Sequence, residues 1–269
     1  MLNKLLVAGA SGRMGKSVLS SAIDACQFDI IACIEAAGHP DIGKDAGVLC
    51  GRGALGVSVA SEFTAGADVV IDFSQPVSAD AIIDYCLENG SALVMGTTGL
   101  SEGQHKKITK ASEKIAIIYG TNMSVGMNVL FELAAKAANI LGDDYDIEII
   151  EQHHRFKKDS PSGSALSLAE GICKATDRAY PDCLVHGREG KDALRKKGEI
   201  GIHAVRAGDI VGKHSVIFST LGETVTLTHD AHSREGFAKG AIRAAKWLAG
   251  KEPGLYTMAD CLGIKQIDV

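Results

Sequence analysis

The sequence has no uninterrupted apolar run long enough to cross a bilayer, and its first residues lead directly into a glycine motif without a signal-peptide cleavage site. We therefore predict a cytoplasmic protein with no membrane partner. It also has no basic excess: Lys and Arg number 28 against 33 Asp and Glu, a formal net charge of −5 that excludes general attraction to nucleic acid. The seven cysteines include no C-x-x-C pair, and buried reduced thiols account for them.

What is present is typical of a globular α/β protein. The 269 residues are 46% hydrophobic and 23% charged, so the chain can form two modest domains or one large one around a substantial core. The 31 glycines are a generous supply of the kind that strand-to-helix turns require. No repeat or low-complexity segment interrupts the chain.

The first motif joins a short apolar strand at residues 5–8 to a helical pattern that continues beyond residue 15. The turn between them reads Gly9-Ala10-Ser11-Gly12-Arg13-Met14-Gly15. A tight turn after a buried strand presents free N–H groups to a pyrophosphate, and glycines keep side chains out of its way. By itself this spacing is a weak signal that also occurs in ordinary turns.

A second strand at residues 29–35 strengthens the prediction, because it ends in Glu35, about twenty residues after the turn, as expected for a carboxylate that binds an adenosine ribose. This order of features predicts a dinucleotide site: a strand, a glycine turn, a helix, a second strand and an acid at its end. No basic residue follows Glu35, where Ala36-Ala37-Gly38 stands. NAD is therefore favoured, although Arg13 is a candidate partner for the 2′-phosphate of NADP.

Strands alternate with helices as far as residue 119, which predicts a Rossmann-like, doubly wound parallel sheet. Strands are expected at residues 68–74, 92–95 and 115–119, and residues 42–56 read as a surface loop. Ligands of such sheets lie beyond the carboxyl ends of the strands. The turns after the last two strands should therefore line the nicotinamide end of the site, with residues Gly96, Thr97, Thr98, Gly120, Thr121, Asn122 and Met123.

The second half of the chain predicts an α+β domain with an open mixed sheet. A long apolar-faced helix at 124–141 precedes a strand at 145–150, and alternating strands follow a polar, mobile loop at 180–199. A last amphipathic helix at 237–248 is expected to return to the first domain. We predict a dinucleotide-binding domain at residues 1–124 and 234–269, a substrate-binding and oligomerisation domain at 125–233, and hinges near Ser124 and Ser233.

Between that strand and the next helix, residues 151–164 bring titratable groups to a helix start. The helix start at Ser162-Gly163-Ser164 could hold a carboxylate or phosphate on free backbone N–H groups. Lys157 and two other basic residues on the same loop add positive charge. The side chains of His153 and His154 titrate near neutral pH. These groups would suit proton transfer to an anionic substrate. A simple helix cap flanked by solvated charges is the alternative. We expect no metal, because adjacent strand residues point to opposite faces.

In these motifs the chain resembles the 4-hydroxy-tetrahydrodipicolinate reductases, also called dihydrodipicolinate reductases, of bacterial and plant lysine biosynthesis. Besides the glycine turn, the resemblance rests on the following pieces: Gly96-Thr97-Thr98-Gly99, Ile147-Glu148-Ile149-Ile150-Glu151, His153-His154-Arg155, Lys157, Asp159, Pro161-Ser162-Gly163 and Arg206-Ala207-Gly208-Asp209-Ile210-Val211-Gly212. Each piece is short, but the combination is specific and spans nearly the whole chain.

The resemblance implies reduction of a dicarboxylate ring by NAD(P)H, with NADH use expected, and a homotetramer. It implies His153 as proton donor or acceptor and Lys157 as proton donor, and it assigns the substrate carboxylates to His154, Gly163 and Ser164. The cofactor would be held by residues 9–14, Glu35, 96–98 and 120–123. Three positions depart from the family pattern: Ala36 replaces a frequent arginine, Phe156 a frequent histidine and Ser164 a frequent threonine.

Two other functions stay open from the residues themselves. One is another two-domain nicotinamide enzyme, such as an amino-acid or semialdehyde dehydrogenase, although no cysteine lies near the histidine pair to form a thioester. The other is an NAD-sensing protein without catalysis, which would have no use for the histidines, Lys157 and the anion-binding helix start.

Overall fold

The computed structural model describes residues 1–63 and 66–264, and these form two compact units. Unit 1 contains Met1–Val125 and Arg234–Gly263, and unit 2 contains Gly126–Ser233. The last residues of the predicted first domain, 265–269, lie outside the described residues.

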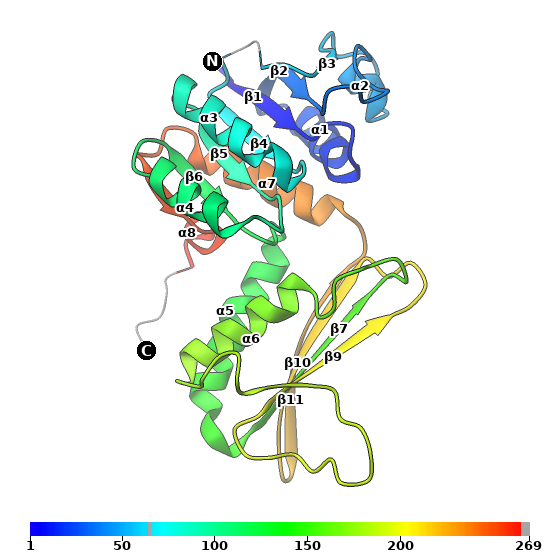
Figure 1. The fold of residues 1–269 in the computed structure, drawn as a ribbon, viewed down its shortest axis with the longest axis vertical. Coiled ribbons are helices and arrows are strands. Elements are labelled where there is room, and N and C mark those ends of the chain that lie inside the picture. Colours follow the sequence, from blue (N-terminus) through cyan, green and yellow to red (C-terminus); the bar gives the residue numbers. More distant parts are fainter. Residues whose placement is uncertain (64–65, 265–269) are drawn as a thin grey trace. The chain divides into compact units, whose positions relative to one another are not determined.

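Unit 1 is built on a seven-stranded sheet in the order β12-β6-β5-β4-β1-β2-β3, with parallel pairing throughout (Figure 1). Its strands are β1 (Asn3–Ala8), β2 (Phe28–Ile34), β3 (Val59–Ala60), β4 (Val69–Asp72), β5 (Ala92–Met95), β6 (Ala116–Tyr119) and β12 (Gly254–Tyr256). The strand order reverses between β1 and β4, so the Rossmann-like fold is confirmed and its ligand crevice is expected at that point.

Helices cover both faces of this sheet, which explains why its central strands read as continuous apolar runs. Successive residues of a strand point to opposite faces, so Leu5 and Val7 pack with α1 and α7, whereas Leu6 and Ala8 pack with α3 and α4. The helical elements of unit 1 are α1 (Arg13–Ala25), α2 (Ala46–Leu49), η1 (Pro76–Ser78), α3 (Ala79–Asn89), α4 (Glu102–Ala111), α7 (Glu235–Leu248) and α8 (Met258–Leu262).

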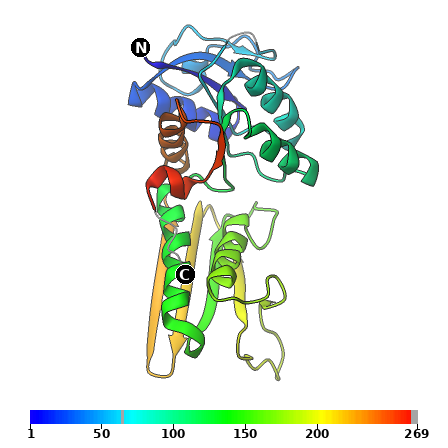
Figure 2. The same ribbon diagram turned by 90° about the vertical axis from the view of Figure 1, so that its left-hand side faces the viewer.

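Unit 2 is a mixed five-stranded sheet in the order β11-β10-β7-β9-β8, with α5 and α6 against one face (Figures 1 and 2). The pairs β7–β9 and β8–β9 are parallel, and the pairs β7–β10 and β10–β11 are antiparallel. The elements are α5 (Val125–Leu141), η2 (Gly142–Asp144), β7 (Asp146–His153), α6 (Gly163–Ala175), β8 (Leu184–His186), β9 (Ile200–Arg206), β10 (Gly212–Thr220) and β11 (Glu223–Ala231).

Three local predictions were wrong in part. The stretch 42–56 is not entirely irregular, because Asp45 caps the short helix α2 and also accepts hydrogen bonds from the N–H groups of Leu55 and Gly56. The loop 180–199 contains β8, which exists only through pairing with β9. Strand β7 continues to His153, three residues into the predicted loop. The ladder with β9 pairs His153 with Arg206, and the ladder with β10 pairs Gln152 with Lys213.

Candidate active site

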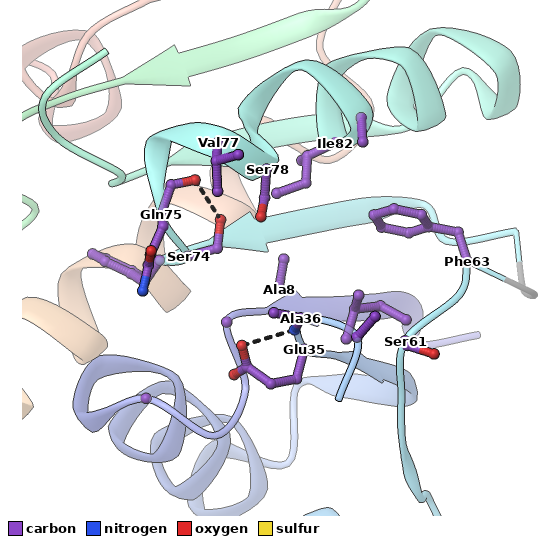
Figure 3. Close-up of a pocket in the computed structure, with 16 residues that line it drawn as sticks. Ala8, Glu35, Ala36, Ser61, Phe63, Ser74, Gln75, Val77, Ser78 and Ile82 are labelled. Carbon is purple, nitrogen blue, oxygen red and sulfur yellow. Dashed lines mark hydrogen bonds between the residues drawn. The ribbon is translucent and has the colours of Figure 1, made fainter. Parts of the chain in front are cut away.

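The crevice of unit 1 lies at the carboxyl ends of β1, β2 and β4. A cavity of about 570 Å³ is lined there by Gly9 and Gly12 after β1 and by Glu35 and Ala36 after β2. The residues after β4 that line it are Phe73, Ser74, Gln75, Val77, Ser78, Ala81 and Ile82 (Figure 3). Phe63 adds an aromatic side chain to its wall (Figure 3). The size and the mixed lining suit the adenosine half of a dinucleotide.

The glycine turn approaches its neighbours too closely for side chains. Gly9 has a φ of +73°, and a Cβ on it would lie 2.6 Å from the carbonyl oxygen of Phe73. A Cβ on Gly15 would lie 2.0 Å from the carbonyl oxygen of Gly9. No side chain caps the start of α1 at Gly12, and its first turn contains no acid. The helix start therefore presents backbone N–H groups and positive partial charge, which fits a pyrophosphate.

Glu35 closes one side of this turn. One of its carboxylate oxygens accepts a hydrogen bond from the N–H of Ser11 at 3.0 Å. The other accepts one from the N–H of Ala36 at 2.9 Å (Figure 3). A carboxylate has about four lone-pair sites, so two hydroxyl groups of a ribose could still bind. The methyl groups of Ala36 and Ala37 beside it bring no positive charge to the cavity.

The two predicted nicotinamide turns follow β5 and β6, one and two strands beyond β4. In the described part of the chain, the cavity lining does not reach them. Thr98 and Thr121 are exposed, but Thr97 is only 2% exposed, and its hydroxyl donates to the buried Asp72 carboxylate at 2.7 Å. Burial raises the pKa of Asp72, although hydrogen bonds from Ser74 and Thr97 oppose this. The Thr97 side chain is therefore directed into the protein, and its hydrogen bond to Asp72 holds the turn in place.

Glycine and methionine have structural roles at these two turns. A Cβ on Gly96 would lie 2.3 Å from the ring of Phe73. Met123 is buried in the core, and the side-chain oxygen of Asn122 accepts a hydrogen bond from the N–H of Ser124 at 2.9 Å. Gly120 leads into the second turn. Both turns are thus fixed from within unit 1.

In unit 2, the predicted reaction centre is built around Glu151. On β7 the residues Ile147, Ile149, Glu151 and His153 share the face that packs on the helices, so Glu151 occupies a position that the pattern otherwise gives to core residues. Its carboxylate is completely buried, and it accepts hydrogen bonds from His153 Nδ1 at 2.6 Å, from Arg206 at 2.7 and 2.8 Å, and from the N–H of Ser162 at 3.0 Å.

These partners decide the charge of the buried carboxylate. Burial alone would raise the pKa of Glu151, but the hydrogen bonds from His153, Arg206 and Ser162 outweigh it and lower the pKa to about 2. Glu151 is therefore ionised at neutral pH.

Lys157 lies on the short loop between this strand and α6. Its Nζ donates to the Asp159 carboxylate at 2.9 Å, and Arg206 donates to the backbone carbonyl of Asp159 at 2.7 Å. The Lys157 side chain is 21% exposed, so its ammonium group is held in place yet accessible. His154 is half-buried, with its ring 6.3 Å from that of Phe156.

Helix α6 begins at Gly163 beside this cluster. The Ser162 hydroxyl oxygen accepts from the N–H of Ala165 at 3.2 Å and so caps the helix. Gly163 is exposed, and no atom lies within 4 Å of where its Cβ would be, so an anion could approach its backbone. Ser164 follows, half-buried, in the first turn. The structure thus brings His153, Lys157 and Gly163 to one end of unit 2.

His214 on β10 completes the cluster from the other side, and it is only 3% exposed. Its Nε2 lies 3.1 Å from the Ser162 hydroxyl, and its ring stands edge-to-face with that of His153 at 5.2 Å. Burial, together with the nearby His153, lowers the pKa of His214 to about 3. It is therefore a neutral, structural histidine.

We expect His214 to make the protein less stable in mild acid. The pKa of the unfolded residue is about 6.5 and that of the folded residue about 3, so the unfolded chain gains a proton that the folded chain excludes as the pH falls from 6.5 toward 3. Between pH 7 and pH 5 this should cost about 2 kcal/mol of unfolding free energy. Urea titrations should show that loss in the wild type and a smaller one in His214→Gln, whereas the exposed His232→Gln should behave as the wild type. Equal pH dependence in all three proteins would contradict the assignment.

Comparison with known proteins identifies the family. Residues 3–123 match the family model described as Dihydrodipicolinate reductase, N-terminus, and residues 126–262 match Dihydrodipicolinate reductase, C-terminus. The chain belongs to the dihydrodipicolinate reductase family. A relative from Hahella chejuensis named 4-hydroxy-tetrahydrodipicolinate reductase is 44% identical over 267 residues, which cover 98% of this chain and 100% of the relative. The predicted family is confirmed.

Solved structures agree on the fold. A dipicolinate-bound dihydrodipicolinate reductase from Paenisporosarcina sp. TG-14 superposes with a TM-score of 0.75 at 23% identity, covering 98% of this chain and 100% of the other. Aspartate semialdehyde dehydrogenase II from Vibrio cholerae shares the fold at a TM-score of 0.55, 10% identity and coverage of 91% and 98%. Because the fold is common to both enzymes, only the family match decides against a semialdehyde dehydrogenase.

Four residues of this family member were not given a role from sequence. These are Asp72, Glu151, Arg206 and His214. Glu151 and Arg206 stand within the motifs that carried the resemblance, and the i, i+2 spacing of Glu151 and His153 on a strand was a usable signal of their contact. Asp72 and His214 gave no comparable signal. Among the described residues, no cluster of His, Cys, Asp or Glu could hold a metal ion.

Proposed function

We propose that the protein is a 4-hydroxy-tetrahydrodipicolinate reductase. It would use NAD(P)H to reduce that compound to tetrahydrodipicolinate, with loss of water, in the diaminopimelate route to lysine. The observation that carries this proposal is the family match over both units, and the cluster of His153, Lys157 and the α6 start gives it a chemistry. The protein uses a nicotinamide cofactor, as its family and Rossmann-type unit imply.

The start of α6 is our candidate for the substrate carboxylates. Gly163 and Ser164 would bind one carboxylate through backbone N–H groups, and His154 would contribute a side chain. The open space at Gly163 supports this assignment. The dipicolinate bound to the Paenisporosarcina enzyme is a ring dicarboxylate of the kind proposed here.

His153 and Lys157 are our candidates for proton transfer. Lys157 would donate the proton that accompanies reduction, and its positive charge would stabilise the electron-rich intermediate of a dianionic substrate. His153 would donate or accept a proton through the ring nitrogen that Glu151 does not bind. The ion pair of Lys157 with Asp159 supports a fixed position for the donor.

The cofactor would lie in unit 1 on Gly9, Ala10, Ser11, Gly12, Arg13 and Met14, with its ribose on Glu35 and its nicotinamide at residues 96–98 and 120–123. When bound, it supplies the hydride. We propose that NADH binds at least as well as NADPH, because Ala36 and Ala37 line the cavity beside Glu35 without positive charge. Arg13 is exposed at the start of α1 and is the remaining candidate for a 2′-phosphate.

We also propose a homotetramer that works in the cytoplasm. Helices cover only one face of the unit 2 sheet in the described part of the chain, and Ile150, Ile217 and Thr226 belong to the opposite face. Within the described residues, no helix has the length and apolar character needed to span a membrane. Light scattering that gave the mass of a single chain would contradict the tetramer.

One assay tests both reaction and cofactor. We expect 4-hydroxy-tetrahydrodipicolinate, generated in situ by the preceding synthase, to drive loss of absorbance at the reduced nicotinamide band, with a kcat/KM for NADH equal to or above that for NADPH. No oxidation of either cofactor would overturn the proposed function. A large advantage for NADPH would leave the reaction intact and refute the cofactor preference.

A further inference from the structure

We infer that Glu151 is the positioning residue of the proton-transfer centre. It holds His153 by Nδ1 and so leaves Nε2 as the nitrogen that exchanges protons with the substrate. Arg206 keeps Glu151 ionised and aligned. This inference rests on the proposed function, because it takes His153 as a proton-transfer group.

The hydrogen bonds of Glu151 exclude a direct role for it. Oε1 accepts from Arg206 Nη2 at 2.7 Å and from the N–H of Ser162 at 3.0 Å. Oε2 accepts from Arg206 Nη1 at 2.8 Å and from His153 Nδ1 at 2.6 Å. These four donors use all of the roughly four lone-pair sites of a carboxylate. Glu151, which is completely buried, therefore has no site left for a substrate proton and acts only through the groups it binds.

The same contacts choose the tautomer of His153. An ionised carboxylate only accepts hydrogen bonds, so Nδ1 must carry the proton that it shares with Glu151. The neutral ring then has its lone pair on Nε2. That nitrogen lies beside Gly212, where a Cβ would come within 3.1 Å of it. Because Gly212 has no side chain, none extends from that position over Nε2.

Glu151 also ties the parts of the site together. Through Ser162 it fixes the residue that caps α6, and through Arg206 it reaches the carbonyl of Asp159, the partner of Lys157. One buried ion pair thus sets the ring of His153, the helix start proposed for the substrate and the loop of Lys157. If Glu151 served only to link β7 to β9, its ion pair with Arg206 would be sufficient, and the hydrogen bonds from His153 and Ser162 would not be needed.

Strand β7 contains a matched carboxylate with a different arrangement. Glu148, on the opposite face, accepts hydrogen bonds from Arg188 and Arg195 and from His203 Nε2, the last at 2.6 Å. Its side chain is 21% exposed. Both glutamates bind arginine and histidine, but only Glu151 lies among the candidate catalytic groups. Glu148 is therefore the control for Glu151.

The test combines ring ¹⁵N NMR with kinetics on the full-length protein. In the wild type, the His153 signals, assigned by comparison with His153→Gln, should show the neutral ring protonated on Nδ1. In Glu151→Gln, the amide NH₂ can donate to Nδ1, so we expect the neutral ring to become protonated on Nε2. The kcat should fall roughly 10- to 100-fold, as for the loss of a carboxylate that orients a histidine. KM for substrate and Kd for NADH should change less than about threefold, because the glutamine carbonyl oxygen can still accept the hydrogen bond from the N–H of Ser162 at the helix start proposed for the substrate.

Glu148→Gln makes the same chemical change on the same strand and should leave both kcat and the His153 signals as in the wild type. Arg206→Lys keeps the charge but loses the two-pronged contact, and it should lower kcat while NADH affinity is retained. A wild-type His153 protonated on Nε2 would overturn the inference, even if Glu151→Gln failed to fold. Normal kcat in a folded Glu151→Gln protein would also overturn it. An inactive wild type with the expected tautomer would instead refute the proposed function.

Discussion

Lys157→Ala should lower kcat by about 100-fold or more, with a much smaller change in the Kd for NADH. Lys157 is the proposed donor of the proton that accompanies hydride transfer, and its ammonium group is positioned by Asp159 at 2.9 Å. Alanine removes both the proton and the positive charge next to a dianionic substrate. Steady-state kinetics with a saturating cofactor and a separate NADH titration by fluorescence would measure the two effects independently.

The neighbouring Lys158 provides the control for this experiment. It is exposed on the same loop and differs from Lys157 by one position. Lys158→Ala changes the net charge by the same amount, so any general effect of charge on substrate attraction should appear in both variants. We expect kcat near the wild-type value for Lys158→Ala. If Lys157→Ala retained the wild-type kcat, Lys157 would have no part in the mechanism.

The sequence predicted those features of the protein that depend on short stretches of chain. The glycine turn followed by a helix, Glu35 at the end of the next strand and the helix start at Gly163 each depend on the conformation of a few neighbouring residues. The alternation of buried strands and amphipathic helices predicted the Rossmann-like sheet for the same reason. These features could be predicted because local geometry and burial act together at each of them.

The long-range contacts within the unit 2 cluster could not be derived from local pattern. Glu151 and Arg206 are separated by 55 residues, and they meet because β9 pairs with β7 in parallel. His214 reaches the same cluster because β10 pairs with β7 on its other edge in antiparallel register. The strand order of a mixed sheet follows from the packing of the whole unit, so neither contact has a signature in either segment alone.

The short elements were missed for a related reason. Strand β8 has three residues, and its conformation is stabilised by the ladder it forms with β9. Helix α2 has four residues, too few to be stable alone, and Asp45 ties its start to Leu55 and Gly56. Helix and strand propensities say little about segments of three or four residues, because tertiary hydrogen bonds decide which conformation such a segment adopts.

Gly240→Ala should strongly destabilise unit 1. Gly240 lies in the middle of α7, where alanine normally stabilises a helix by about 1 kcal/mol relative to glycine. Here a Cβ would lie 1.7 Å from the carbonyl oxygen of Met123 and 2.8 Å from its carbonyl carbon. Both atoms are backbone, so α7 or the turn at residues 120–123 must move. We expect a net loss of about 3 kcal/mol and a fall in Tm of roughly 6–12 °C, measured by calorimetry.

Gly236→Ala separates this close approach from the general effect of alanine in a helix. Gly236 lies one turn earlier on α7, is exposed, and has no atom within 4 Å of a Cβ position. It should gain a few tenths to about 1 kcal/mol, the opposite sign to Gly240→Ala. Because the displaced turn is the one proposed to hold the nicotinamide, Gly240→Ala should also weaken NADH binding at temperatures where it stays folded. Equal stability of the two variants would show that α7 can move away from Met123 without loss of unfolding free energy. The position of the turn at residues 120–123 would then be determined by other contacts.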